Sequence, residues 1–383
     1  MNSKIIEILL PIICGLTAAN MYYIQSLVPA VTNELNINYS LASMIYTLSL
    51  IGNAVSLIFI APLGDFLDRK SMIVKLYALL SLATLLFYFS TNIYVLLAIA
   101  FLIGIGVSVV PIIISYLSMN KISGINSIGR IMAGILLGAL FSRFLASAFE
   151  SLWGWKSIYL FAVICMICSF TFISFFLPKD TGEKPPRGHY AHLIKSTFSL
   201  LITDSNIRMC SFLGFMVMAI FASFWNNISI YLFNEFDMSQ LGIGLFSLTG
   251  VAGASAALFA NRILKIIGYS NRLLCFLLAL SFLLLWLDSI NLILLAVGAL
   301  FLDAFIQLIH VNNQVNMYKF CKGNESRAAS CYMTSFTLGG AFGAKLSSTT
   351  YLAFGWKGIC IFCMVIAITC LIPKQKYNQR DTL

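Results

Sequence analysis

The stretch Pro62–Lys75, PLGDFLDRKSMIVK, holds five charged residues between two long segments that have none. Residues 35–64 before it and residues 76–120 after it contain no Asp, Glu, Lys or Arg. A helix rises about 1.5 Å per residue and a bilayer core is about 30 Å thick, so roughly 20 apolar residues make one crossing. The stretch therefore predicts a short polar loop between two membrane-spanning helices.

The composition of the whole chain is that of a protein whose solvent is lipid. Of its 383 residues, 60% are hydrophobic and only 10% are charged, and the mean hydropathy is +0.92. A soluble domain carries about 25% charged residues. Backbone groups in lipid must pair internally, which leaves helices or closed barrels, and these apolar runs are continuous instead of alternating. We therefore expect an all-α membrane protein.

Twelve apolar runs are predicted as spans, and a long polar connection divides them into two sets of six. The runs are residues 8–31, 40–61, 72–89, 93–118, 127–149, 158–177, 207–233, 240–260, 273–288, 291–317, 328–351 and 358–373. The first run is expected to be a retained span, because it lacks the small-residue cleavage site of a signal peptide. The predicted domains are thus a six-helix bundle over 1–177, a cytoplasmic linker over 178–206 and a second six-helix bundle over 207–383.

The linker contains an amphipathic pattern of its own. Apolar side chains recur there at helical spacing, which predicts a short helix on the membrane surface. They are Tyr190, Leu193, Ile194, Phe198 and Leu201. Nearby His189 and His192 are expected to be solvated loop residues, and no metal or cofactor is predicted. The Cys-x-x-Cys pairs, Cys165/Cys168 and Cys360/Cys363, lie in apolar runs without acids or histidines and are expected to be packing residues.

The distribution of Lys and Arg predicts the orientation. The terminal segments and the loops on their side of the membrane hold 20 of these cations, whereas the opposite loops hold only Lys156 and Lys357. Cytoplasmic loops are enriched in Lys and Arg, so both termini are expected in the cytoplasm. The expected location is the cell membrane, and in particular the bacterial inner membrane. The net charge of +10 is then an orientation signal, and no nucleic-acid partner is expected.

The two predicted bundles share an internal repeat. Gly-Trp-Lys follows span five at residues 154–156 and span eleven at residues 355–357, and a glycine precedes each motif by 16 residues, at Gly138 and Gly339. Repeats of six spans plus six are typical of transporters that rock about a site at the repeat interface.

The charged loop resembles a signature of the major facilitator superfamily, whose consensus there is Gly-x-Leu-Ala-Asp-Arg-x-Gly-Arg-Lys. Asp65, Arg69 and Lys70 match, whereas the two consensus glycines are Ala61 and Asp68. Further stretches resemble the drug:proton antiporter and sugar-efflux-like branch of that superfamily. They are residues 19–29 (ANMYYIQSLVP), Gly104-x-Gly106 with Val110-Pro111, and the run from Gly129-Arg130 through Ser142-Arg143 to Gly154-Trp155.

The resemblance implies a fold of twelve helices in two pseudo-repeats and a latch role for the loop. In that role Asp65 would accept backbone N–H groups at the start of span eleven, near Ser326, Arg327 and Ala328, while Arg69 and Lys70 secure the loop. The alternative is that these charges only anchor the loop in the cytoplasm. The chain departs from the antiporter pattern at Ala100, where proton-coupled members often carry Arg, and it has no Gly-Pro pair over 134–147.

Three charged residues lie inside the predicted spans, where charge is costly and marks functional candidates. Asp303 is 11 residues past Leu292, roughly 16 Å along the helix and thus near the midplane. Arg143 and Lys345 occupy near-equivalent positions of spans five and eleven and could face each other across a central cleft. For each residue a purely structural role is the alternative: Lys345 could extend to the outer surface, Arg143 could bind backbone carbonyls, and Asp303 could be a hydrogen-bonded packing residue.

Polar residues at helical spacing predict a wet cavity between the bundles. Asp303, Gln307, His310 and Gln314 share one face of span ten, as Tyr46, Ser49, Asn53 and Ser56 share one of span two. The expected substrate-binding residues are Arg143, Lys345, Asn20, Tyr23, Asn53, Asn227, Tyr231 and Gln307, and the expected proton-coupling residues are Asp303 and His310. For His310 the alternative of a satisfied polar residue stays open.

These observations predict a secondary transporter and not an enzyme, because no catalytic grouping is present. The first interpretation is proton-coupled efflux of a small organic solute, and the alternative is an uptake permease for an anionic metabolite or a carboxylate-type metal chelate. A third, an intramembrane enzyme or receptor, lacks both a catalytic motif and an output domain. The expected partners are a small-molecule substrate, protons and the lipid bilayer, and the protein is expected to be a monomer.

Overall fold

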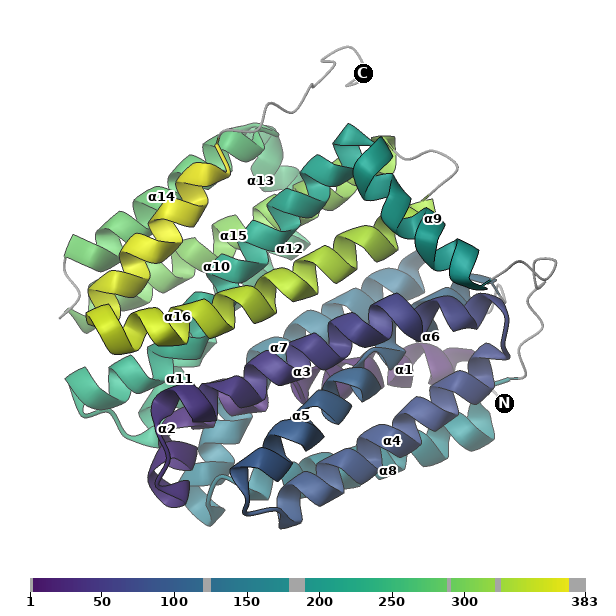
Figure 1. Cartoon of the computed structure of the whole chain (residues 1–383), viewed down its shortest axis with the longest axis horizontal. Helices are drawn as coiled ribbons and strands as arrows, with labels where there is room; N and C mark the ends of the chain where they lie inside the picture. The colour runs from purple at the N-terminus through teal and green to yellow at the C-terminus, as the bar shows by residue number, and fades with distance from the viewer. Residues whose placement is uncertain (1–2, 120–124, 179–189, 288–290, 321–324, 372–383) are drawn as a thin grey trace.

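The computed structural model describes residues 3–119, 125–178, 190–287, 291–320 and 325–371, and this part of the chain is helical with no strand. Figure 1 shows two groups of helices, α1–α8 below and α10–α16 above, with α9 beside both at the right. The bounds are α1 Ser3–Ala19, α2 Tyr23–Leu35, α3 Tyr39–Phe59, η1 Ala61–Asp65, α4 Arg69–Phe89, α5 Ile93–Val107, α6 Val109–Met119, α7 Ile125–Trp153, α8 Ser157–Phe176, α9 Tyr190–Thr203, α10 Ser205–Phe236, α11 Gln240–Ser247, η2 Leu248–Gly250, α12 Val251–Leu258, α13 Ala260–Ile267, α14 Asn271–Leu287, α15 Leu292–Phe320 and α16 Glu325–Thr369.

The apolar helices confirm the predicted fold class. Ten segments of the described chain are long and apolar enough to cross a membrane, and the bent pair of α13 and α14 supplies another. α16 is interrupted by the non-helical Gly355 (φ 63°, ψ −159°), so that its 45 residues comprise two spans. The twelve spans of the prediction are therefore present.

Several predicted spans are broken helices, which the sequence did not indicate. Span one divides at residues 20–22 into α1 and α2, because the Asn20 amide donates to the Leu16 and Thr17 carbonyls (2.9 and 3.3 Å) and so satisfies the end of α1. Span four divides at Ser108 and span eight at η2. Broken helices at membrane depth are tolerated where the freed backbone lines a cavity or lies buried in protein.

Buried hydrophobic side chains form two main clusters. One runs from Leu10 to Leu177 and takes in a few residues of α10 and α16, and the other runs from Leu213 to Cys370. Cys360 and Cys363 are fully buried in the second cluster, as expected of packing residues. The prediction is wrong for Cys168, which is exposed on the surface of α8, whereas Cys165 is partly buried.

The internal repeat has a structural counterpart. A Cβ at Gly138 would lie 2.1 Å from the Gly15 carbonyl oxygen, and one at Gly339 would lie 2.0 Å from that of Phe215. Glycine thus lets α7 approach α1 and α16 approach α10 backbone to backbone. Gly154 and Gly355 both have positive φ (83° and 63°), so each turns the chain after a span. The repeat therefore encodes matching helix crossings and matching turns.

The linker contains the predicted helix, α9. The Tyr190 hydroxyl donates to the Phe59 carbonyl at the end of α3, and the Cys331 thiol of α16 donates to the Thr197 carbonyl (2.9 Å). α9 therefore contacts both groups of helices at one end of the molecule, which we call the α9 end (right in Figure 1). The opposite end, where α2 and α11 lie, is called the α11 end.

The charged loop lies at the α9 end. Its Asp68 side chain caps α4 by accepting from the Ser71 N–H (2.8 Å), a role that the consensus glycine could not fill. The Arg69 side chain is buried and passes within 3.7 Å of the Cβ position of Gly64. The side chains of Asp65 and Ser326 lie outside the described residues, so the latch stays a prediction.

Candidate functional site

Arg143 on α7 is the buried cation around which the candidate site is built. It is 3% exposed, and its Nε donates to Oε1 of Gln25 on α2 (2.7 Å). The Ser26 hydroxyl of α2 donates to the Arg143 carbonyl (2.9 Å) and fixes the two helices together. The α1–α2 break is what turns this face of span one toward Arg143, since Gln25 lies in the first turn of α2.

Aromatic rings enclose the Arg143 guanidinium. Its central carbon lies 4.2 Å from the ring centre of Trp225 and 5.3 Å from that of Phe221, both on α10, and 5.5 Å from that of Tyr22. Arginine stacks well on aromatic faces, and such contacts strengthen when water is excluded. The cation of one group of helices is thus held partly by the rings of the other.

Trp225 connects this cation to the buried acid Asp303. The indole Nε1 donates to Asp303 Oδ1 on α15 (2.9 Å), and Asp303 is 4% exposed. The other carboxylate oxygen lies 3.0 Å from the Cβ position of Gly250, in η2, so any larger residue there would crowd it. The Trp225 indole therefore contacts Arg143 through its ring and Asp303 through its N–H. We call Arg143, Gln25, Trp225 and Asp303 the central cluster.

Hydrogen bonds join the two groups of helices at the α11 end. The Tyr39 hydroxyl of α3 contacts the Asn227 Oδ1 and the Asn226 carbonyl of α10 (2.6 and 3.0 Å). The Gln240 amide at the start of α11 donates to the Ser26 carbonyl (2.6 Å). We call these contacts the α11-end clamp.

The clamp is continuous with the central cluster. The Ser229 hydroxyl of α10 donates to the Gln25 carbonyl (2.8 Å), and the Gln240 amide also reaches the Ser147 hydroxyl of α7 (3.3 Å). Gln25 therefore touches both Arg143 and the contacts that hold this end together.

Three residues expected to bind substrate lie within the first group of helices. Asn20 caps α1 and approaches Met166 of α8. The Tyr23 ring packs edge-on against Tyr159 (6.1 Å), and the Asn53 amide donates to the Gly104 carbonyl of α5 (3.2 Å). None of these contacts joins Asn20, Tyr23 or Asn53 to the central cluster.

The second group of helices divides its expected residues in the same way. Asn227 takes part in the α11-end clamp and donates to the Ser347 hydroxyl (2.8 Å), whereas the Tyr231 ring stacks on Trp356 (4.3 Å, 11°). Lys345 is partly exposed and sits between the buried Ala344 and the exposed Leu346. The contacts that enclose Arg143 come from Gln25 and the aromatic rings, and Lys345 is not among them within the described residues.

The polar face of α15 is present, but its members have different neighbours. Gln307, one turn from Asp303, lies against Gly253 of α12. His310 is paired with the Tyr332 hydroxyl of α16 through Nδ1 (2.8 Å) and lies 4.4 Å from the Phe336 ring. It is about 10 Å along the helix from Asp303.

Sequence reasoning missed Trp225, Gln25, Tyr22 and Phe221. Gln25 carried a signal, because an amide inside an apolar run demands a partner. The aromatic residues gave no such signal, because the sequence does not distinguish a ring that faces a cation from any other apolar residue of a span. Their role depends on which helices meet.

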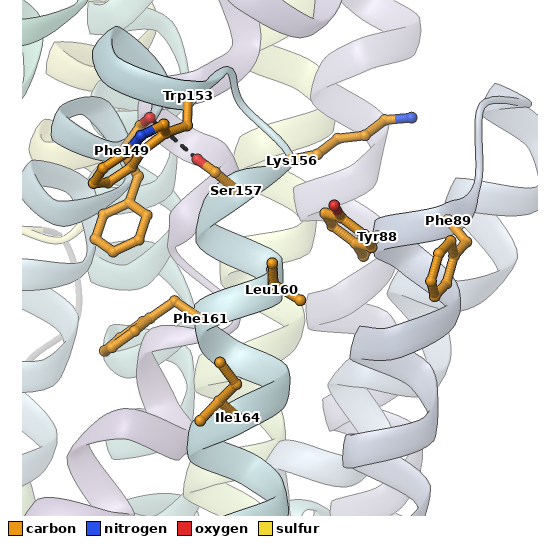
Figure 2. Close-up of a pocket in the computed structure, with 9 residues that line it drawn as sticks. All are labelled: Tyr88, Phe89, Phe149, Trp153, Lys156, Ser157, Leu160, Phe161 and Ile164. Carbon is orange, nitrogen blue, oxygen red and sulfur yellow. Dashed lines mark hydrogen bonds between the residues drawn. The ribbon is translucent and has the colours of Figure 1, made fainter.

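A separate pocket of about 600 Å³ lies among α4, α7 and α8. It is lined mostly by aromatic and aliphatic side chains, including the exposed Trp153 and Phe89, and it shares no residue with the central cluster. Figure 2 shows Lys156 at its edge, and the ammonium group lies 5.4 Å from the ring centre of Trp155, which does not line the pocket. Apolar surface of this kind suits contact with lipid.

Comparison with known proteins identifies the family. The family model described as Major Facilitator Superfamily matches residues 12–309 and 211–374. The chain belongs to the Major Facilitator Superfamily. The uncharacterized transporter YgaY of Escherichia coli O157:H7 is 30% identical over 382 residues, covering 97% of this chain and 95% of the relative. The inner membrane transport protein YnfM of Escherichia coli K12 is 25% identical over 241 residues, or 62% of this chain and 58% of the relative.

Solved structures of other transporters share the fold. The nucleoside transporter NupG superposes with a TM-score of 0.77 at 12% identity, covering 95% of this chain and 98% of NupG. A POT family transporter in complex with a thioalcohol-conjugated peptide also gives 0.77, at 16% identity, covering 94% and 93%. The chain is thus a multi-pass membrane transporter of this superfamily. The drug:proton antiporter and sugar-efflux-like branch stays a prediction.

Proposed function

We propose that this transporter moves a small organic solute by alternating access, with its transport coupled to protons. The moving bodies would be the bundles over 1–177 and 207–383, joined by the linker over 178–206. The two hydrophobic clusters and the repeated helix crossings support this division. A site at the interface of two structural repeats is the arrangement on which rocking transporters depend.

The observation that carries the proposal is the buried Trp225–Asp303 hydrogen bond, because Trp225 also contacts Arg143 of the other bundle. A proton on Asp303 would cancel its charge and weaken both this bond and its attraction to Arg143. Proton occupancy would then change the free energy of contact between the bundles, which is what coupling requires.

The α11-end clamp supports a role as a gate. It closes one end of the interface between the bundles directly beside the central cluster. From the bias of Lys and Arg we propose that the α9 end and both termini face the cytoplasm of a bacterium and that the clamp faces outward. The relative YnfM is an inner membrane protein, which supports the same membrane for this chain. We further propose that the protein works as a monomer.

The contacts favour some proposed site residues over others. Arg143, Gln25 and Asn227 are proposed to contact the solute or the gate beside it, and Asp303 to carry the proton. The pairing of His310 with Tyr332 supports a role in which it adjusts the α15–α16 contact. At the α9 end, Asp65, Arg69 and Lys70 are proposed to form the latch that replaces the clamp when the protein is closed to the cytoplasm.

The direction of transport has two candidates. Efflux is supported by the resemblance of spans one, four and five to efflux members of the superfamily. Uptake of an anionic metabolite or a carboxylate-type chelate is favoured by a specific observation, the buried cation Arg143 with hydrogen-bond donors around it.

Proton coupling and the direction of transport are tested with the purified protein in vesicles that contain a pH-sensitive dye. A filtered small-molecule extract of bacterial cells is added, and proton movement and solute content, by mass spectrometry, are followed under pH gradients of either sign. We expect solute movement to require one gradient sign in the wild type and to lose that requirement in Asp303→Asn. The matched control is Asp237→Asn, because Asp237 is exposed and has a positive φ that asparagine accommodates. Gradient-driven accumulation that persists in Asp303→Asn would remove Asp303 from the mechanism.

A further inference from the structure

We propose that the central cluster takes an anionic group of the substrate, a carboxylate or a phosphate, and that this anion and Asp303 alternate as the counter-charge of Arg143. The inference rests on the proposed transport function and deepens its anionic candidate by naming the groups that bind the anion and the charge that it replaces. It further implies that one proton accompanies each singly charged anion.

The first argument is a group of buried donors that have nothing to donate to within the described part of the protein. They are Arg143 Nη2, Gln25 Nε2 and the Tyr46 hydroxyl. The three side chains come from α7, α2 and α3, and their exposed fractions are 3% or less. Buried polar groups are nearly always paired, so several unpaired donors at one place call for an acceptor.

The second argument is that these donors converge. Arg143 Nε and Gln25 Oε1 are 2.7 Å apart, and each unpaired nitrogen shares a carbon atom with one of this bonded pair. The two unpaired nitrogens therefore lie within about 7 Å of each other. The Tyr46 ring lies 6.2 Å from the Tyr22 ring, which in turn contacts Arg143. One group with two acceptor oxygens can serve both nitrogens.

The third argument is the sign of the charge. A cationic substrate would meet the Arg143 guanidinium, and the ring faces that could attract a cation are already occupied by it. The carboxylate that could attract a cation, Asp303, is bonded to the Trp225 N–H on the far side of the indole. Arginine with adjacent amide and hydroxyl donors matches carboxylate and phosphate oxygens.

Charge balance then links the anion to a proton. Arg143 and Asp303 are both buried, and with Asp303 deprotonated the empty cluster is neutral overall. An anion on Arg143 would leave one uncompensated negative charge in a water-poor site, which is costly. A proton taken up by the Asp303 carboxylate from the water on the open side cancels that charge. Proton and anion then cross together, and this favours the uptake candidate.

The substrate class is tested with vesicles that hold the wild type or Arg143→Gln, exposed to the same filtered extract of bacterial cells. The matched control is Arg262→Gln, which removes an exposed cation of α13. We expect the enriched solutes to carry carboxylate or phosphate groups, with enrichment about 10-fold or more lower in Arg143→Gln and unchanged in Arg262→Gln. Enrichment of neutral or cationic solutes by the wild type overturns the inference but not the proposed transport function. This outcome is measured on the wild type alone, so it does not depend on whether a variant folds. No enrichment over protein-free vesicles under either pH gradient overturns the proposed function itself.

The alternation with Asp303 is tested with the solute that the wild type enriches. The uncharged amide of Asp303→Asn resembles the protonated carboxyl. In this variant the charge of Arg143 is therefore neutralised only when an anion is bound. We expect it to retain exchange of labelled for unlabelled solute within about 3-fold of wild type, and to lose accumulation driven by the pH gradient, by about 10-fold or more. Loss of exchange in Asp303→Asn, with correct folding shown by its thermal midpoint, would overturn the alternation.

Discussion

Tyr39→Phe should shift the protein toward the state that is open at the α11 end. The substitution keeps the ring, which lies 5.5 Å from Tyr351, and removes only the hydroxyl that contacts Asn227 Oδ1 and the Asn226 carbonyl (2.6 and 3.0 Å). These two contacts lie across the bundle interface and exist only while the clamp is closed. The change therefore acts on the equilibrium between the two states and leaves the packing of each bundle unaltered.

The magnitude follows from the lost hydroxyl. Its one hydrogen is shared between two acceptors, the Asn227 Oδ1 and the Asn226 carbonyl, so one bifurcated hydrogen bond is lost and the closed state loses about 0.5–1.5 kcal/mol relative to the open one. Because 1.4 kcal/mol is about a tenfold change in an equilibrium constant, the ratio of open to closed protein should rise by roughly 2- to 13-fold. The Asn227 amide keeps its bonds to Ser223 and Ser347 (2.7 and 2.8 Å), which limits rearrangement inside α10 and α16.

Pulsed electron paramagnetic resonance between spin labels measures these populations. Labels at Glu34→Cys and Glu235→Cys report on the exposed ends of α2 and α10, in a background where the exposed Cys168 is replaced by Ser. The control is Tyr94→Phe, which removes a hydroxyl from a 72% exposed side chain and should leave the distance distribution unchanged. If Tyr39→Phe gives the same populations as Tyr94→Phe, the clamp does not hold the closed state.

Two further substitutions test the site and the packing. Trp225→Phe removes a hydrogen bond to a charged acceptor, which is worth about 1.5–3 kcal/mol. Because the lost N–H stabilises the deprotonated carboxylate of Asp303, the pH profile of transport should move by about one to two units toward higher pH. Trp356→Phe is its control, since that buried indole N–H has no acceptor within the described residues, and equal profiles for the two variants would contradict the coupling role. Gly339→Ala should lower the thermal midpoint of the purified protein, at a cost of about 1–3 kcal/mol, because the added Cβ would lie 2.0 Å from a backbone oxygen. Gly129→Ala, where nothing lies within 4 Å, should be neutral or slightly stabilising, and a similar midpoint for both alanines would refute the close crossing of α16 and α10.

The sequence by itself determined the membrane fold. Lipid offers no partner for backbone groups, so runs of about 20 apolar residues can only be helices, and their number and order can be read along the chain. The glycines that recur before Gly154 and Gly355 also indicated the repeat, because a backbone-to-backbone helix crossing tolerates no side chain. These features depend on neighbours close in sequence or on the solvent.

The tertiary structure decided which charged and polar residues meet. Arg143 and Lys345 hold near-equivalent places in the repeat, yet Arg143 is enclosed by rings of the other bundle while Lys345 is partly exposed. Asn20 and Tyr23 share a short polar stretch with Gln25, but the break at residues 20–22 rotates α2 relative to α1, and it is Gln25 that contacts Arg143. The direction of a side chain depends on helix breaks and on helix crossings that join residues more than a hundred positions apart. Helical spacing within one span does not predict these breaks and crossings.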